Sequence, residues 1–458
     1  MARSTLIQKN ILLIVKIKIM KKILLLFVFA FSTSLIAQNR FHKIDSLLNY
    51  LNKNNKFMGS ISVREGDKVA FSKGYGFADV DEKIKAENIT KYKIGSISKV
   101  FTAVITMQLI EENKLRLDTK LSKYFPKIEN ADNISIENLL HHRSGIKDYI
   151  NQDSITKEEL GTFNIKEMIL NKITNYKAIA EPNTKFEYSN SNYYLLGSII
   201  EIITKKSFAE NLEKRIVKKI GLNNTYYPKE LVVIANKESY SYLFDGSKWK
   251  KTEESKNDIA YAAGAIISTP NDLTLFFHEL FEGKEGKLIK KRSLESMKEI
   301  KDGYGKALIQ MPFGERKFYG HTGGIESFGS VVGYYPSEKV GISLIVNGDN
   351  FNRNDIMIGI LSIYYKLPFP FPSFETINPE TIKKYSGIYS SKEIPLKITI
   401  FGKNEELLAQ ATGQNSFPLT QKNKNTFVFQ AARIELEFGE KSFILHQGGQ
   451  KFTFNLEE

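Results

Sequence analysis

Serine and lysine side chains three residues apart are the first feature of this chain that could do chemistry. The 458-residue sequence holds four Ser-x-x-Lys pairs: Ser96/Lys99, Ser144/Lys147, Ser154/Lys157 and Ser247/Lys250. Only Ser96 directly precedes a long apolar-periodic segment, residues 100–110, which predicts a helix. Side chains at i and i+3 share one helix face, so Lys99 could reach the Ser96 hydroxyl, and the positive helix end would favour an oxyanion there. The spacing predicts Ser96 as a nucleophile with Lys99 beside it.

A hydroxyl nucleophile needs a base, and the sequence offers two kinds. Lys99 could serve if burial lowers its pKa, or a tyrosine could relay the proton. Tyr-x-Asn occurs three times, at Tyr50/Asn52, Tyr149/Asn151 and Tyr188/Asn190. Residues 186–193 form a polar stretch before the apolar run 194–203, which indicates a loop that leads into a helix. We therefore expect Tyr188 and Asn190 at the site, with Tyr149 as the alternative to Tyr188.

A third group of candidate residues is His321-Thr322-Gly323-Gly324, which follows the strand-like residues 317–319. Glycines on a strand allow a substrate backbone to lie alongside it. The alternative is a strand that ends in a turn with two glycines, beside a histidine with a structural role.

Taken together, these three motifs follow one another in an order that resembles the class C β-lactamase, DD-peptidase and esterase superfamily of serine hydrolases. Residues 139–145, Leu-Leu-His-His-Arg-Ser-Gly, and 262–273, which begin Ala-Ala-Gly-Ala, are similar to further family segments. The resemblance covers about residues 42–365. It implies an α/β (α+β) fold, in which an antiparallel sheet flanked by helices is built from both ends of the unit. A mostly helical lobe, about 125–300, is inserted, and the site lies between the lobes.

The same resemblance implies the roles of the site residues. Ser96 would attack a carbonyl and form an acyl-serine intermediate, while Lys99 and Tyr188 handle the proton. Backbone N–H groups of Ser96 and Gly324 would form the oxyanion hole. Asn190 would hold a substrate amide or orient Lys99, and Tyr188 would activate the deacylating water. His142 is expected to brace a loop near the cleft.

One residue departs from the pattern of β-lactamases and DD-peptidases, which usually carry lysine where this chain has His321. A neutral imidazole attracts a carboxylate less than an ammonium does. The departure favours relatives that resemble D-aminopeptidases and esterases. The expected activity is cleavage of a D-amino-acid peptide, a cell-wall fragment or an ester. The alternatives are a β-lactamase and a non-catalytic protein that binds penicillin or senses the cell wall.

The elements expected to position these residues follow from apolar periodicity. Helices are predicted over 41–54, 100–110 and 353–366, together with one that Thr269 caps and Pro270 begins. Strands are predicted over 58–63, 69–75, 317–319, 328–335 and 341–346. The expected hydrolase domain covers 38–367.

The C-terminal part of the chain has a different pattern. Prolines at 368, 370, 372 and 379 indicate a linker. Short strands are then predicted over 396–401, 406–411, 426–430, 434–438, 443–446 and 451–455. Residues 380–458 are expected to form a small antiparallel β domain, of a type often appended to such hydrolases.

The N-terminus reads as a targeting segment. Met20-Lys21-Lys22, the apolar run 23–31 and a cleavage site after Ala37 predict that residues 1–37 are a signal peptide, in which residues 1–19 are expected to precede the true start. The prediction is export to the periplasm or cell exterior, and the alternative is an uncleaved membrane anchor. Six of the 65 basic residues lie there, so the net charge of the remaining chain is +8 instead of +14.

Composition excludes several other classes of chemistry and partner. The chain has no cysteine, which rules out disulfides and thiolate chemistry, and its six histidines form no metal motif. We expect no metal and no cofactor. No nucleic-acid-binding motif is present, so the expected partner is a small-molecule or peptide substrate, including cell-wall fragments.

Overall fold

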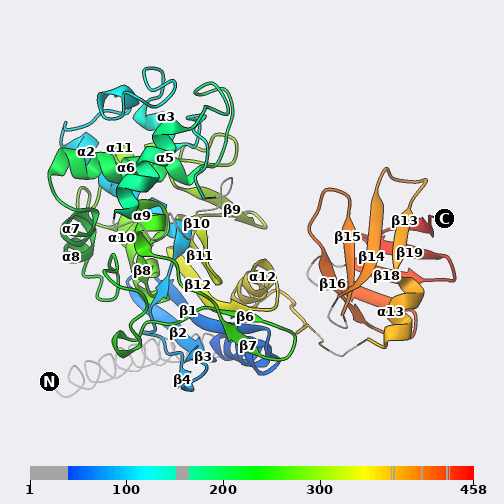
Figure 1. Cartoon of the computed structure of the whole chain (residues 1–458). Coiled ribbons are helices and arrows are strands. Elements are labelled where there is room, and N and C mark those ends of the chain that lie inside the picture. Colours follow the sequence, from blue (N-terminus) through cyan, green and yellow to red (C-terminus); the bar gives the residue numbers. More distant parts are fainter. Residues whose placement is uncertain are drawn as a thin grey trace, which may run out of the picture. The chain divides into compact units, whose positions relative to one another are not determined.

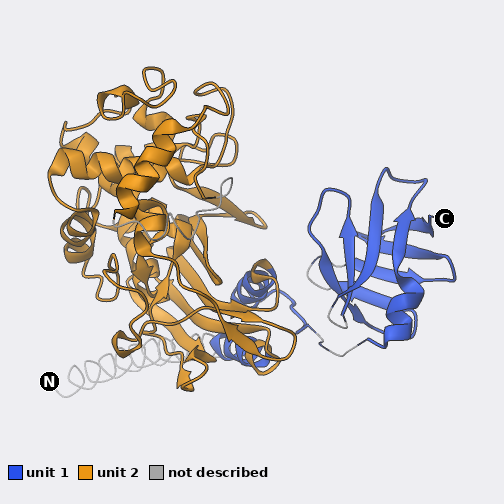
Figure 2. Cartoon of the chain, viewed as in Figure 1, with its two compact units in different colours: residues 1–50, 355–458 blue, residues 51–354 orange. Residues whose placement is uncertain are grey.

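The computed structural model describes residues 40–150, 164–372, 374, 377–403, 406–429, 432 and 434–457. The chain divides into two compact units, residues 51–354 and residues 1–50 with 355–458 (Figure 2). The predicted signal peptide and the Ser154/Lys157 pair lie outside the described residues. Among the helices that are described, none is both long and apolar enough to cross a bilayer.

The unit of residues 51–354 is built on one antiparallel sheet with the strand order β2-β1-β12-β11-β10-β9. Residues on both faces of β1 and β12 are buried, as expected for central strands covered on both sides. The sheet pairs strands from both ends of the unit (Figure 1). Its strands are β1 (Phe57–Glu65), β2 (Lys68–Tyr75), β9 (Ile309–Phe313), β10 (Arg316–Ile325), β11 (Phe328–Tyr335) and β12 (Val340–Asp349).

A mostly helical lobe lies between β2 and β9 in the sequence, as the resemblance implies (Figure 1). Its helices are α2 (Ser98–Glu111), α3 (Ile136–Leu140), α5 (Ile165–Asn175), α6 (Asn190–Thr204), α7 (Phe208–Leu212), α8 (Lys218–Ile220), α9 (Asn257–Gly264), α10 (Pro270–Glu282) and α11 (Lys291–Met297). Three short ribbons accompany them: β3 (Phe77–Asp79) with β4 (Ile84–Lys85), β5 (Tyr92–Lys93) with β8 (Ile267–Ser268), and β6 (Tyr242–Phe244) with β7 (Trp249–Lys251).

Two helices explain how the lobe and the sheet share a core. α10 begins as predicted, with Thr269 accepting a hydrogen bond from the Asp272 amide and Pro270 in the first turn, and it packs on β1, β11 and β12. α2 is buried on every side from Ser98 to Leu109, and its Phe101 ring stacks on Phe276 of α10 at 3.9 Å. The core therefore runs from the sheet through α2 into the lobe.

Ser96 lies in a short 3-10 helix, Gly95–Ile97, directly ahead of α2. The structure corrects two sequence predictions in this unit. β10 does not end at Tyr319 but continues through His321 to Ile325. β12 extends to Asp349, three residues beyond the predicted end. The extension of β10 pairs with β11, and the end of β12 pairs with β1, so strand pairing continues past the apolar residues that the sequence marks.

The second unit holds helices together with a closed eight-stranded antiparallel barrel. One helix covers residues 40–53, of which 40–50 belong to this unit. Another is α12 (Arg353–Tyr364), which belongs to this unit from Asp355 onward. Phe41 contacts Tyr364, and Leu47 lies against Gly359. The barrel strands are β13 (Gly387–Ser390), β14 (Lys397–Lys403), β15 (Glu406–Ala411), β16 (Phe417–Gln421), β17 (Thr426–Phe429), β18 (Ile434–Phe438), β19 (Ser442–Gln447) and β20 (Gln450–Leu456).

The prediction of a C-terminal antiparallel β structure is confirmed, with two omissions. β13 and β16 were not predicted, because Gly387 and Pro418 interrupt their apolar pattern. Pro379 was assigned to the linker, yet it begins helix α13 (Pro379–Tyr385), where its missing N–H costs nothing and Asn378 caps the helix.

Candidate active site

The segment before Ser96 is fixed against β10 by a glycine. Gly95 has φ +52°, and a Cβ built on it would lie 2.8 Å from the backbone nitrogen of Gly324. Any other residue would be strained by this φ and would clash with the strand. The contact brings the nucleophile segment directly against the strand that carries His321 to Gly324. The Ser96 side chain itself is half-buried.

We expect Gly95→Ala to lower both stability and activity. A left-handed alanine costs about 1–3 kcal/mol, and the clash with β10 would in addition move Ser96 away from Gly324. Gly314→Ala is the matched control, because Gly314 has φ +59° with no atom within 4 Å of a built Cβ. Thermal unfolding and kcat/KM on one ester substrate should show a larger loss for Gly95→Ala in both. Equal losses in the two variants would contradict the packing account.

Lys99 is fully buried, and its ammonium contacts three acceptors among the described residues. Nζ lies 2.9 Å from Ser96 Oγ, 2.8 Å from Asn190 Oδ1 and 2.8 Å from the carbonyl oxygen of Ala263. Burial lowers the Lys99 pKa to about 7, against the opposing charge of Asp148. The side chain can therefore lose a proton near neutral pH, after which its amine can accept the proton of Ser96.

The pH dependence of acylation follows from this pKa. Below about pH 7 Lys99 is an ammonium and cannot act as a base, so kcat/KM should fall about tenfold per pH unit there and level off above it. Steady-state kinetics on a neutral ester between pH 5 and 9 measure this directly. A rate that is constant over the whole range, or one that is still rising at pH 9, would contradict Lys99 as the base.

Tyr188 contacts the nucleophile from another side. Its hydroxyl donates to Ser96 Oγ at 2.8 Å, and its ring lies 5.0 Å from Lys99 Nζ. Burial raises the Tyr188 pKa far above its ordinary value, so the hydroxyl stays protonated near neutral pH. His142 lies against this ring with 4.2 Å between centroids. Tyr188 is thus placed to pass a proton between Lys99, Ser96 and a leaving group, whereas Lys99 is the group that can start as a base.

Asn190 is oriented by Asp148, a residue that the sequence analysis did not identify. The Asn190 amide nitrogen Nδ2 lies 3.2 and 3.1 Å from the two carboxylate oxygens of Asp148, and the Asn190 backbone N–H donates to Asp148 Oδ1 at 3.1 Å. These bonds leave Asn190 Oδ1 to accept from Lys99. Of the two roles expected for Asn190, the structure places it to orient Lys99.

The residues His321 to Gly324 lie on β10 beside Ser96. β9 pairs with β10 only from Arg316 to Gly320, so the following half of β10 is paired on its β11 side only, among the described strands. A built Cβ on Gly323 would lie 2.1 Å from the Ile94 carbonyl oxygen, so this glycine accommodates the nucleophile segment instead of a substrate. Thr322 and Gly324 are exposed, and the Gly324 backbone borders the same cavity as Ser96.

His321 is buried and neutral. Its Nε2 lies 3.0 Å from the Tyr304 hydroxyl, and its Nδ1 lies against the carbonyl of Thr322. Burial, together with the charge of Lys99, lowers the His321 pKa to about 4. Tyr304 was not predicted either. Like Asp148, it carries no local signal, because its partner lies 17 positions along the chain.

Two cavities meet at Ser96 and Tyr188. The larger, about 670 Å³, is bordered by Gly324 and by apolar side chains that include Ile150, Leu243 and Ile259, with the Asp349–Arg353 ion pair also on its lining. The smaller, about 250 Å³, is bordered by Tyr304, Ile309 and residues 321–324, and none of its described lining residues carries a formal charge. An acyl group and a leaving group could thus occupy two separate cavities that both border Ser96. Within the described residues, no three His, Asp or Glu side chains are grouped to hold a metal ion.

The other candidate pairs have structural surroundings. Ser144 Oγ donates to Asn192 Oδ1, and Ser247 is in an exposed turn capped by Asp245. The Tyr149 hydroxyl donates to the Ile259 carbonyl, and Tyr50 packs against Phe371 and Phe374. Ser96, in contrast, contacts both Lys99 and Tyr188.

An antiparallel sheet with an inserted helical lobe and a lysine-assisted serine between them defines the class of β-lactamase-like serine hydrolases. The comparison with known families agrees: a model described as "Beta-lactamase" matches residues 52–361, and the chain belongs to this family.

The chain is also similar to individual proteins and solved structures. The chain is 33% identical over 212 residues to Protein flp of Staphylococcus aureus, an alignment that covers 45% of this chain and 42% of that protein. It thus spans less than half the length of that relative. It is 24% identical to penicillin-binding protein 4* of Bacillus subtilis, over 90% of this chain and 98% of the relative. The structure of D-amino acid amidase from Ochrobactrum anthropi is similar with a TM-score of 0.63 and 23% identity, over 72% of this chain and 99% of that one.

Proposed function

We propose that the protein hydrolyses an amide or ester bond through an acyl-Ser96 intermediate. The observation that supports this most strongly is that Ser96 Oγ contacts a buried lysine with a pKa near 7 and a protonated tyrosine at once. Neutral Lys99 takes the Ser96 proton as Oγ attacks the carbonyl carbon. Backbone N–H groups of Ser96 and Gly324 receive the negative charge that develops on the carbonyl oxygen.

The intermediate then collapses as the bond to the leaving group breaks. Tyr188 donates its proton to the leaving amine or alkoxide and recovers one from Lys99. A water molecule then gives a proton to the Lys99–Tyr188 pair and attacks the acyl-serine carbonyl. As the bond to Ser96 breaks, the pair returns a proton to Ser96 Oγ. The product is a carboxylic acid, and the enzyme is regenerated.

The leaving group is proposed to be small and uncharged. The cavity of about 250 Å³ beside Ser96 offers the neutral His321 and the Tyr304 hydroxyl, and the described residues that line it include no cation to hold a carboxylate. The charged pair Asp349–Arg353 borders the other, larger cavity. An amide or ester of a D-amino acid or of a short cell-wall peptide fits this arrangement, and the name of the structurally similar D-amino acid amidase is consistent with it.

A substrate panel separates this proposal from its alternatives. We expect D-phenylalanine amide or a D-amino acid ester to be hydrolysed at least tenfold faster, in kcat/KM, than a peptide ending in D-Ala-D-Ala with a free carboxylate. Ser96→Ala provides the background for each substrate. A preference for the free-carboxylate peptide would instead support a carboxypeptidase, and rapid turnover of a penicillin would support a β-lactamase. If the folded protein hydrolysed no substrate of the panel, a binding or sensing role would be supported.

We also propose that the mature protein acts outside the cytoplasm, where cell-wall fragments occur. The basic, apolar and small-residue order of residues 1–37 supports this proposal. N-terminal sequencing of the protein recovered from the periplasm or medium would support cleavage after Ala37, whereas recovery of intact protein in the membrane fraction would support an uncleaved anchor.

A further inference from the structure

A strained tyrosine lies inside α9, away from the groups that carry out the proposed reaction. Tyr261 has φ 42° and ψ −132°, which interrupts the helix, and its side chain is almost fully buried. A bulky residue rarely adopts this backbone conformation, and it persists only where the surroundings hold it. Such strain is expected to have a structural consequence for the residues next to it.

The two carbonyl groups that follow Tyr261 both accept hydrogen bonds from α2. The Ala262 carbonyl accepts from Thr102 Oγ1 at 2.7 Å, and the Ala263 carbonyl accepts from Lys99 Nζ at 2.8 Å. A regular helix would direct these carbonyls along its own axis. The turn at Tyr261 therefore supplies one of the three acceptors of the lysine.

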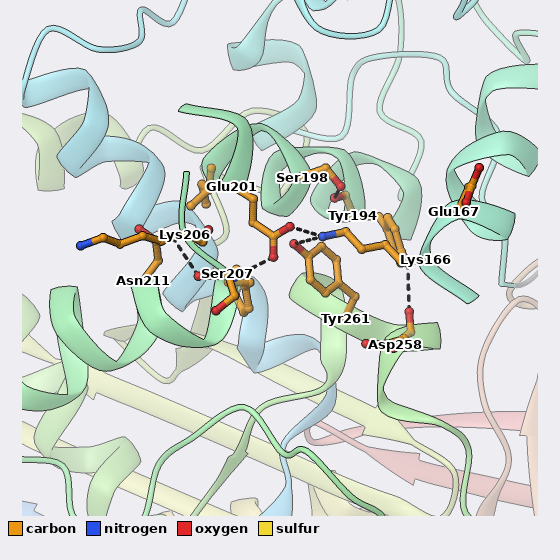
Figure 3. A network of polar contacts seen from close by, with 12 residues as sticks. Lys166, Glu167, Tyr194, Ser198, Glu201, Lys206, Ser207, Asn211, Asp258 and Tyr261 are labelled. Carbon is orange, nitrogen blue, oxygen red and sulfur yellow. Dashed lines mark hydrogen bonds and ion pairs between the residues drawn. The ribbon is translucent and has the colours of Figure 1, made fainter. Parts of the chain in front are cut away.

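The Tyr261 side chain is held by a polar network at its hydroxyl. Lys166 donates to the Tyr261 hydroxyl at 3.1 Å and forms an ion pair with Glu201 (Figure 3). Glu201 also accepts from the Phe208 backbone N–H at 2.7 Å. The Tyr261 ring is enclosed by the rings of Tyr194, Phe208 and Tyr227, with centroids 4.9, 5.4 and 6.1 Å away.

This network and the lysine share one helix. Glu201 lies near the end of α6, and Asn190, which accepts from Lys99, begins the same helix. α6 and α9 pack so closely that a Cβ on Gly197 would lie 2.3 Å from Ala262 Cβ and 2.7 Å from Tyr261 Cε1. Two of the three acceptors around Lys99 are thus set by α6, one directly and one through Tyr261.

We propose that Tyr261 is a positioning residue for Lys99: its anchored side chain holds a strained backbone turn that directs the Ala263 carbonyl at Nζ and keeps water away from the lysine. This inference rests on the proposed role of Lys99 as the base. Release of the turn would let water replace the carbonyl, and because burial is the main cause of the low Lys99 pKa, that pKa would rise.

Substitutions of Tyr261 should have little direct electrostatic effect on Lys99, because Tyr261 is uncharged and its hydroxyl faces a different group of side chains. Among the described residues, the titratable groups that face Lys99 are Asp148, His142, His321, Tyr188 and Tyr193. Lys166, Glu201, Asp258 and Tyr227 belong to the Tyr261 network instead. Replacement of Tyr261 by an uncharged residue leaves every charge in place, so a shifted pH profile would report a change of geometry.

The test compares Tyr261→Ala with Tyr261→Gly, and the matched control is Tyr227→Ala, which removes a ring from the same cluster. Alanine loses the anchor and cannot easily hold this φ and ψ, whereas glycine can. We expect Tyr261→Ala to lower kcat at least tenfold with KM changed less than threefold. The rising limb of kcat/KM should move at least half a pH unit upward. Tyr261→Gly should lose less activity than Tyr261→Ala, and Tyr227→Ala should keep the wild-type profile.

Other outcomes would overturn the inference. If Tyr261 served packing alone, Tyr261→Gly would lose at least as much activity as Tyr261→Ala. The folded protein would then keep the wild-type pH profile in both variants. Thermal unfolding measures the fraction that is folded. The rate at which a fluorophosphonate labels Ser96 is recorded in parallel. Failure to label the wild type would count against the proposed function, whereas normal labelling with the same pH profile in all variants would count against the role of Tyr261 alone.

Discussion

Ser96→Ala is expected to remove essentially all hydrolytic activity, with a loss in kcat of at least about 10⁴-fold. The variant keeps the fold, because the half-buried Ser96 side chain contributes, among the described residues, hydrogen bonds to Lys99 and Tyr188. The remaining rate would come from substrate binding and the backbone N–H groups of the oxyanion hole. Hydrolysis of the best substrate from the panel, followed with excess enzyme, measures the loss.

The control for this variant is Ser247→Ala, which removes the serine of another Ser-x-x-Lys pair in an exposed turn. It should retain wild-type kcat and KM. Substantial hydrolysis by purified Ser96→Ala, with contaminating hydrolases excluded, would mean that a different group attacks the substrate.

Lys99→Met is expected to lower kcat/KM by about 10²–10⁴-fold, the usual contribution of a positioned base. Methionine has a similar length and fills the same buried space without an amine, so Ser96 would keep its place but lose the group that accepts its proton. The rising limb near pH 7 should disappear from the residual activity, because the titrating group is gone. Kinetics between pH 5 and 9 test both expectations together.

Lys147→Met is the matched control, since Lys147 belongs to the Ser144 pair and lies over the Tyr176 ring. Its pH profile should be that of the wild type. If Lys99→Met kept both the rate and the limb near pH 7, Lys99 would be structural, and Tyr188 would have to start the reaction despite its raised pKa.

Local spacing explains which parts of the site the sequence could predict. Ser96 and Lys99 lie on adjacent turns of one segment, so their contact follows from helix geometry. Tyr188 and His321 were identified from motifs whose order resembles a family, because their approach to Ser96 depends on how α6 and β10 pack. Asp148 and Tyr304 act only through tertiary partners, and no spacing along the chain marks them.

The fold shows the same division between local and long-range information. The strand pair β1–β2 and the cap of α10 follow from apolar runs, a short polar connection and capping residues. The closure of the C-terminal strands into a barrel, by pairing of β13 with β20, joins residues about 65 positions apart and has no local signature. The turn at Tyr261 is also invisible in the sequence, since tyrosine is a poor residue for that conformation.

The central claim is that Ser96 is the activated nucleophile, and covalent labelling tests it most directly. The purified chain and Ser96→Ala are incubated with a fluorophosphonate at pH 8, and intact mass and peptide mapping follow. The account predicts one adduct per molecule in the wild type, located on Ser96, and none in the variant. An adduct on another residue, or folded wild-type protein that remains unlabelled, would contradict it.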